Sequence, residues 1–164
     1  MHARRRLVLL IGGAALSACG FELRGTPSLP FSRIALEGFA TRSPMADELR
    51  RSLAQNAVVV AAPAQAQVVL QVINDQREKS VVASTSAGQV REFQLRVRLA
   101  FRLSTPAGRE LIPTTELLQT RDVSYSETVA LAKEYEEAAL YRAMQSDVVA
   151  QLMRRLAGVK NLQG

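Results

Sequence analysis

The sequence predicts an α+β fold in which two helices pack on one face of a mostly antiparallel four-stranded sheet, in the order β-α-β-β-β-α. Two observations support this fold class. Residues 92–103 alternate strictly between polar and apolar side chains, as a strand with one buried face does. Residues 44–53 and the stretch after Ser126 instead place apolar side chains at steps of three and four, as amphipathic helices do.

The first strand and the first helix are expected between residues 33 and 56. Apolar and polar residues alternate over residues 33–37, which predicts a short strand. Ser43 is a suitable cap for the helix that follows, and Pro44 suits its first turn. We expect this helix to end near Asn56. Its buried stripe falls at four-residue steps on Met45, Leu49 and Leu53.

Three further strands are expected in the middle of the chain. Residues 58–60 and 66–75 are rich in β-formers and are separated by a loop around Pro63; the second segment begins apolar on both faces, which predicts an inner strand. A turn at residues 105–108 should lead into a return strand over 116–125. The clearest buried face belongs to Phe93, Leu95, Val97, Leu99, Phe101 and Leu103.

A long helix is expected from just after Ser126 to Ala157, with Gly158 as the residue that ends it. We assign residues 33–158 to one α+β domain, because the sequence shows no internal repeat and no sign of a second domain. Residues 159–164 are assigned to a C-terminal tail. The buried face of the helix consists of Tyr141, Met144, Val148, Leu152 and Leu156.

The amino terminus predicts a lipoprotein signal peptide over residues 1–18. Three arginines at 4–6 precede an apolar run over 7–16, and small residues stand before Cys19, the only cysteine. The alternative is a transmembrane anchor, but twelve residues between the last arginine and Cys19 fall short of the about 20 that a span needs. We therefore expect Cys19 to carry a diacylglycerol and an N-acyl chain, followed by an arm over residues 19–32.

Composition excludes most other classes of function. Removing residues 1–18 takes Lys and Arg from 21 to 18 against 15 acids, so the net charge falls from +6 to about +3 and gives no reason to expect nucleic acid. The only histidine, His2, leaves with the signal peptide. Ser-His-Asp or Cys-His catalysis and the usual zinc and copper ligand sets are thereby excluded. We expect no metal, no cofactor beyond the lipid on Cys19, and no enzyme activity.

Two motifs resemble those of one known family. Residues 19–25 read Cys-Gly-Phe-Glu-Leu-Arg-Gly directly after the cleavage site, and residues 130–137 read Ala-Leu-Ala-Lys-Glu-Tyr-Glu-Glu at the start of the last helix. At this spacing and element order, the chain resembles the LPS-assembly lipoprotein LptE family. The resemblance implies an outer-membrane lipoprotein that plugs the LptD β-barrel and contacts lipopolysaccharide as it enters the outer leaflet.

The resemblance also suggests where lipopolysaccharide binds. Lys133 matches a basic position of the family motif found here at residues 130–137, and Arg91, in the loop just before the alternating strand, is the expected second contact. Arg121, on the return strand, shares a face with Val123 and is a third candidate. Two roles remain possible for the residues near the anchor: contact with the barrel wall, or packing within the domain. These residues are Phe21, Leu23 and Arg24.

The polar face of the alternating strand provides further cations. Arg96, Arg98 and Arg102 lie on it, and guanidinium groups match phosphate oxygens in bidentate fashion. The alternative is a solvated strand face that discourages edge pairing.

Two other functions stay open from the residues alone. One is a periplasm-facing lipoprotein accessory of a cell-wall synthase or lipid transporter, which would share the same anchor and fold. The other is a carboxylate-dependent glycosidase using Glu134 and Glu137, although a solvated helix face explains these acids more simply.

Overall fold

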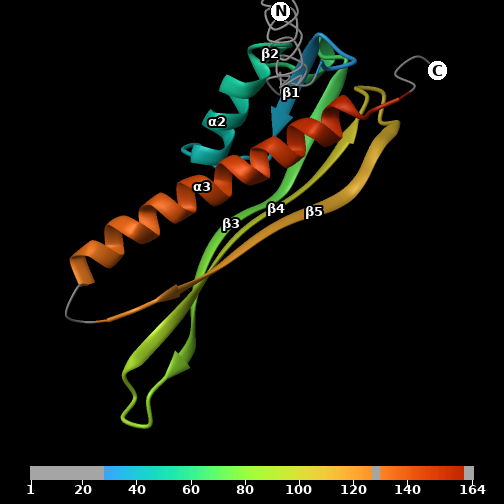
Figure 1. Ribbon diagram of the computed structural model, residues 1–164. Coiled ribbons are helices and arrows are strands. Elements are labelled where there is room, and N and C mark those ends of the chain that lie inside the picture. Colours follow the sequence, from blue (N-terminus) through green and yellow to red (C-terminus); the bar gives the residue numbers. More distant parts are fainter. Residues whose placement is uncertain (1–27, 127–129, 161–164) are drawn as a thin grey trace, which may run out of the picture.

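The computed structural model describes residues 28–126 and 130–160, so Cys19, the signal peptide, most of the expected arm and the last residues of the tail lie outside the described residues. Two helices lie on the same side of a strongly twisted sheet (Figure 1). The described elements are β1 (Arg33–Glu37), α2 (Pro44–Leu53), β2 (Val58–Val60), η2 (Pro63–Gln65), β3 (Val68–Ser84), β4 (Val90–Ser104), β5 (Glu110–Ser124) and α3 (Ala130–Ala157).

The sheet has five strands in the order β2-β1-β3-β4-β5, so the expectation of four strands is wrong. β1 pairs in parallel with both β2 and β3, whereas β3, β4 and β5 are antiparallel. The additional strand is β2, which coincides with the β-rich residues 58–60; the count of four strands left it out, and its three residues are too few to show any alternation. It pairs with β1 because α2 returns the chain to the end of the sheet where β1 began, as a β-α-β crossover does.

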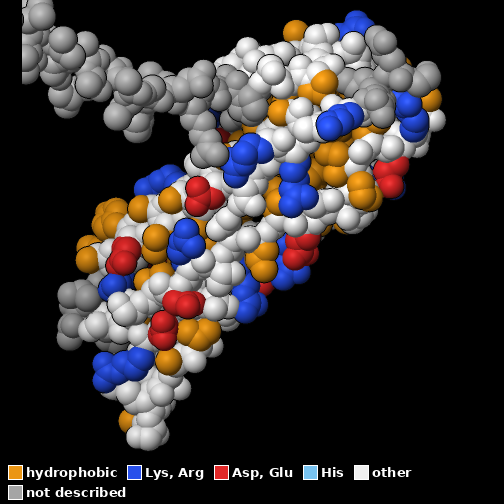
Figure 2. All heavy atoms as spheres, turned by 45° about the vertical axis from the view of Figure 1, so that its right-hand side comes forward, with side chains coloured by type: hydrophobic (Ala, Val, Ile, Leu, Met, Phe, Trp, Pro, Cys, Tyr) orange, Lys and Arg blue, Asp and Glu red, His pale blue; other side chains and the backbone are white. Residues whose placement is uncertain are grey.

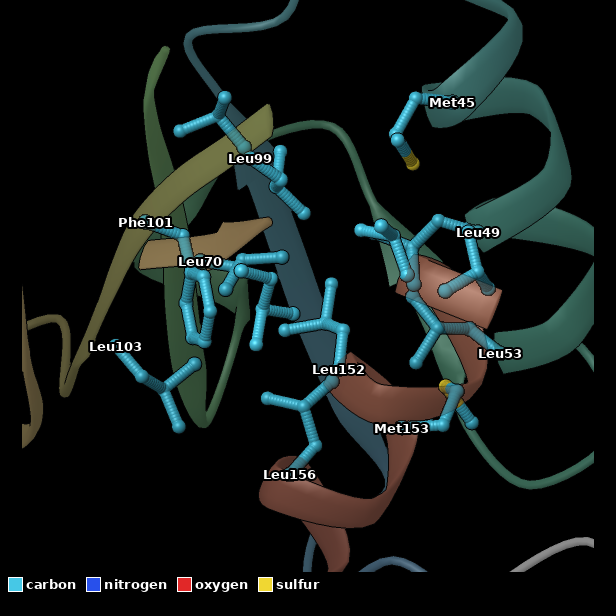
Figure 3. Packing of buried hydrophobic residues seen from close by; sticks show 14 of the residues in the cluster. Met45, Leu49, Leu53, Leu70, Leu99, Phe101, Leu103, Leu152, Met153 and Leu156 are labelled. Carbon is cyan, nitrogen blue, oxygen red and sulfur yellow. The ribbon is translucent and has the colours of Figure 1, made fainter. Parts of the chain in front are cut away.

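The hydrophobic core lies between the two helices and the sheet. Met45, Leu49 and Leu53 of α2 meet Leu152, Met153 and Leu156 of α3 over Leu70, Leu99, Phe101 and Leu103 of the sheet (Figure 3). The alternation predicted for β4 is confirmed from Leu95 to Leu103, where every second side chain is fully buried. The placement of both helices on one face is likewise confirmed.

Local signals explain where α2 begins. Ser43 caps the helix through its Oγ, which accepts a hydrogen bond from the Ala46 N–H at 3.0 Å, and Pro44 is the first helical residue. The Ser43 hydroxyl also donates to Asp75 Oδ2 at 2.6 Å, which ties the helix start to β3. The helix ends at Leu53, slightly before the expected Asn56.

The strands are longer than the sequence patterns suggested. β3 continues to Ser84 instead of ending near Asp75, and β5 begins at Glu110 instead of residue 116. Both hairpins close with the same loop, Thr-x-x-Gly-x, starting at Thr85 and Thr105. In each loop the Thr Oγ1 accepts a hydrogen bond from an N–H four residues on, and the glycine has positive φ. The β3–β4 hairpin extends beyond the helices (Figure 1).

Candidate functional site

Lys133 lies in the first part of α3, close to the end of β5. Its Nζ is 2.7 Å from Glu136 Oε2, one helical turn away, and 3.4 Å from Ser124 Oγ. The side chain is 21% exposed, which is low for a lysine on a helix surface. Lys133 is therefore held against the sheet, and one acidic partner already satisfies its charge.

A small cavity of about 120 Å³ adjoins Lys133. Its apolar part comes from Phe93, Leu95 and Val123, and Tyr125 packs edge-on against Phe93 with ring centroids 5.1 Å apart. Lys79 lies on the β3 side, with its Nζ 4.2 Å from the Phe93 ring centroid and 2.5 Å from Glu137 Oε2. Two lysines and two acids, Glu134 and Glu137, thus border a cavity with an apolar lining, and an amphiphile with a phosphate headgroup would bind there by replacing carboxylates as partners of the lysines.

Arg91 belongs to β4, not to a loop before it, because the strand begins at Val90. It stands at a register shift in the β3–β4 pairing, between the pairs Ala83–Glu92 and Ser84–Val90. Its carbonyl accepts a hydrogen bond from the Tyr125 N–H at 2.8 Å, and its side chain is exposed. Since Lys133 contacts Ser124, the residue next to Tyr125, the structure brings Arg91 and Lys133 to the same end of β5.

Arg121 points toward α3 but at a different level from Lys133. Its Nη2 lies 3.9 Å from Asp147 Oδ2, and its Nη1 donates to the Thr120 carbonyl at 3.1 Å. Asp147 follows Lys133 by 14 residues, about 21 Å along the helix axis. The structure thus gives Arg121 a partner far along the helix from Lys133.

Arg96, Arg98 and Arg102 occupy the opposite face of the sheet from the helices, since the residues between them are buried against the core. Each meets a polar neighbour: Arg96 Nε donates to Gln94 at 2.8 Å, Arg102 Nε donates to Gln71 at 2.6 Å, and Arg98 Nη1 is 3.4 Å from Glu116. The cations predicted from the sequence therefore divide between two faces, and one small ligand cannot contact both sets.

Sequence reasoning missed Lys79 and Arg77, which face α3 from β3. Lys79 pairs with Glu137, while the Arg77 guanidinium bonds Gln145 through Nη2 and lies 5.7 Å from the Tyr141 ring centroid. Both follow Asp75, where the apolar pattern of the strand stops. The repeated Thr-x-x-Gly-x loop was the available signal, because it shows that the strand continues to residue 84.

Tyr141 connects the same part of α3 to the sheet. Its hydroxyl donates to the Glu78 carbonyl at 2.7 Å. Burial raises the pKa of Tyr141 above its usual value, the nearby Glu137 carboxylate raises it further, and Arg77 opposes the shift. Together with the Lys79–Glu137 pair, this contact fastens the first half of α3 to β3 by polar groups.

Neither a metal centre nor a membrane-spanning helix is found in the described residues. Within 28–126 and 130–160, no group of three or more His, Cys, Asp or Glu side chains could hold a metal ion. In the same residues, no helix is long and apolar enough to cross a membrane. The face shown in Figure 2 carries Lys and Arg along its length, interspersed with acidic and apolar side chains.

Comparison with known proteins places these features in a family. Residues 31–156 match the family model described as LptE, Lipopolysaccharide-assembly. The chain belongs to the LptE family. The resemblance predicted from the residues is thereby confirmed. The LPS-assembly lipoprotein LptE of Yersinia pestis (strain Pestoides F) is 31% identical over 170 residues, which cover 97% of this chain and 81% of that protein. LptE of Yersinia pseudotuberculosis (strain YPIII) matches to the same extent.

Two solved structures of bacterial lipoproteins have the same fold as this chain. The solution structure of lipoprotein B from Nitrosomonas europaea superposes with a TM-score of 0.72 at 33% identity, covering 84% of this chain and 90% of that one. The crystal structure of the rare lipoprotein B from Shewanella oneidensis has a TM-score of 0.64 at 24% identity, over 77% of this chain and 94% of that one.

Proposed function

We propose that this chain is an outer-membrane lipoprotein that assembles with the LptD β-barrel, occupies its lumen and contacts lipopolysaccharide during insertion into the outer leaflet. The observation that carries the proposal is the family match over residues 31–156. Relatives named LPS-assembly lipoprotein LptE, aligned over 97% of the chain, support the same assignment. The role is one of binding and assembly, without a catalytic step.

The proposed attachment to the membrane is a lipid on Cys19. The thiol would carry a diacylglycerol and the freed amine a further acyl chain, and each buried methylene contributes about 0.8 kcal/mol, so that two or more chains anchor a protein stably. A lipid in the periplasmic leaflet of the outer membrane would leave the folded domain free to enter a barrel lumen from the periplasmic side.

Lys133 and Arg91 are the proposed contacts to lipopolysaccharide. Arg91 on β4 and Lys133 on α3 both lie near the end of β5, and the cavity beside Lys133 combines two lysines and two acids with an apolar lining. Lys133 Nζ can exchange the Glu136 carboxylate for a lipid phosphate, because both are oxyanions that accept from an ammonium group. Arg91 is exposed and can approach the same headgroup from β4. Arg121, Arg96 and Arg98 are secondary candidates, held by partners of their own.

The deciding experiment is a mild-detergent pull-down of the tagged, acylated protein from outer membranes, with mass spectrometry of bound protein and lipid. A large β-barrel recovered with lipopolysaccharide is the expected result. Recovery of cell-wall synthases or inner-membrane transport subunits instead would favour the accessory-lipoprotein alternative and contradict the proposal. A Cys19→Ala variant that is still exported tests how much of the attachment depends on the lipid.

The lipopolysaccharide contact needs its own test. Lys133→Ala and Arg91→Ala should each weaken retention of purified lipopolysaccharide by roughly tenfold, because a charge-assisted hydrogen bond contributes about 1.5–3 kcal/mol. Lys160→Ala removes the same charge near the other end of α3 and is the matched control. Equal retention by all three variants would remove these two residues from the proposed site.

A further inference from the structure

A larger groove lies between α2 and α3, away from the cavity beside Lys133. The groove is open to solvent, and its volume of about 640 Å³ is within the range typical of ligand-binding clefts. Three arginines from three different elements line it: Arg51 from α2, Arg77 from β3 and Arg142 from α3. Convergence of guanidinium groups from separate elements on one groove is the arrangement that binds phosphate esters.

The floor of the groove is a fixed hydrogen-bond network. Gln145 is 5% exposed, and its Nε2 donates to the Pro44 carbonyl at 3.1 Å and to Glu48 Oε2 at 2.5 Å. Its Oε1 accepts from Arg77 Nη2, which holds that guanidinium in place. Ser146 Oγ donates to Glu48 Oε1 at 2.6 Å. Both carboxylate oxygens of Glu48 are therefore occupied by neutral donors, and the network holds Arg77 without neutralising it.

The remaining charges of the groove favour an anion. Asp47, the other acid of the lining, pairs with Arg50 at 2.9 Å. Within the described ranges, neither the Arg51 nor the Arg142 guanidinium makes a hydrogen bond or ion pair. The lining holds three arginines and two acids, an excess of one positive charge, and Arg50, which lies outside the lining, pairs with Asp47 and offsets its negative charge.

The groove is separate from the proposed Lys133 contact but connected to it. A neighbouring groove of about 500 Å³ shares Arg77 and Arg142 and reaches Lys79, Glu134 and Glu137, which also line the Lys133 cavity. Arg142 follows Lys133 by nine residues, or about 13 Å along the helix. One phosphate cannot contact both ends, whereas a saccharide carrying several phosphates can.

We propose that the groove at Arg51, Arg77 and Arg142 is a second subsite for phosphate groups on a saccharide. The identification of that saccharide as the phosphorylated part of lipopolysaccharide rests on the proposed function; the phosphate chemistry of the subsite does not.

Two probes test the subsite on the full acylated protein in a non-ionic detergent. The first is radiolabelled pyrophosphate in equilibrium dialysis, and the second is purified lipopolysaccharide before and after enzymatic dephosphorylation. The variant Arg51→Ala/Arg142→Ala spares Arg77 and its buried network. Arg154→Ala/Arg155→Ala removes two exposed arginines near the end of α3 and is the matched control for charge. Thermal unfolding of both variants verifies that they fold, and the single exposed change Arg142→Gln replaces the double variant if it does not.

We expect the groove variant to bind pyrophosphate and intact lipopolysaccharide roughly tenfold more weakly than the control does, since charge-assisted hydrogen bonds are about twice as strong as neutral ones. Dephosphorylated lipopolysaccharide should not distinguish the two variants. Equal affinities of the two variants for pyrophosphate, or no retention of pyrophosphate by the wild type, would overturn the subsite. Pyrophosphate bound at the groove with no lipopolysaccharide bound at all would support the subsite while contradicting the lipopolysaccharide contact of the proposed function.

Discussion

The two halves of α3 are held to the sheet by different forces. All of its buried side chains lie between Met144 and Leu156, where they meet α2 and the apolar residues of β3, β4 and β5. The preceding residues of the helix, 130–143, contribute no fully buried side chain: Leu140 and Tyr141 pack against the core only in part, and the Lys79–Glu137 pair and the Tyr141 hydroxyl add polar contacts to β3. Apolar burial therefore stabilises one end, while the other end keeps polar groups near the surface, where they can exchange protein partners for a ligand.

The same substitution on the two halves should measure this difference. Leu152→Ala removes a fully buried side chain and should lower the free energy of unfolding by about 2–5 kcal/mol. Leu131→Ala, on the same helix but 66% exposed, should change it by less than about 0.5 kcal/mol. Chemical denaturation of both variants gives the comparison. Similar losses would show that the first half of α3 is packed as tightly as the second.

The contrast also explains what the sequence could predict. Burial imposes a period on the sequence, so Met45, Leu49 and Leu53 and the alternating residues of β4 identify the core directly. Polar contacts between distant residues leave no such periodic pattern in the sequence. Lys79 pairs with Glu137 across 58 residues, and neither residue type indicates its partner. The β-rich composition of residues 58–60 was recognised, but their pairing as strand β2 was not predicted, because their side chains are partly exposed and carry no one-sided pattern.

The candidate site was predictable only in part. Lys133 and Arg91 were proposed from a motif resemblance, and the structure brings both to the same end of β5, a proximity that the sequence did not predict. The α2–α3 groove could not be found from the sequence, because Arg51, Arg77 and Arg142 are far apart along the chain and meet only through the sheet and helix packing.

Ser43 lies where α2 meets β3, and its substitution should have the next largest effect on the free energy of unfolding. Ser43→Ala removes the helix cap and leaves Asp75 without its hydroxyl donor, so we expect a loss of about 0.5–2 kcal/mol. Ser43→Thr keeps an oxygen at the cap and should recover most of it. Thermal or chemical unfolding provides the measurement. A loss as large with threonine as with alanine would mean that packing around this buried residue, not the hydroxyl, is what matters.

Loss of a polar contact in the first half of α3, residues 130–143, should loosen that half of the helix with little effect on the stability of the whole domain. Glu137→Gln weakens the partly exposed pair with Lys79 and should reduce overall stability by about 0.2–1 kcal/mol. Amide hydrogen exchange should nevertheless become faster in the first half of α3, because that pair is one of its few attachments to the sheet. Glu134→Gln, which lines the same cavity, is the matched control. Unchanged exchange in the Glu137 variant would assign the attachment of this half to other contacts.

Tyr141 tests the polar contacts in the first half of α3 by another route, because its contribution to the free energy of unfolding depends on pH. Its pKa in the folded protein is raised, chiefly by burial and then by Glu137, so folding favours the protonated phenol. The stability it contributes is fully present below the unfolded pKa of about 10 and is lost as pH rises through the higher folded pKa. Tyr141→Phe should cost about 0.5–1.5 kcal/mol near neutral pH through loss of the bond to the Glu78 carbonyl. The difference in stability between wild type and variant should then narrow above pH 10. A difference that stays constant through this range would mean that the phenol ionises equally well in the folded and unfolded chains, and that the first half of α3 leaves Tyr141 open to water.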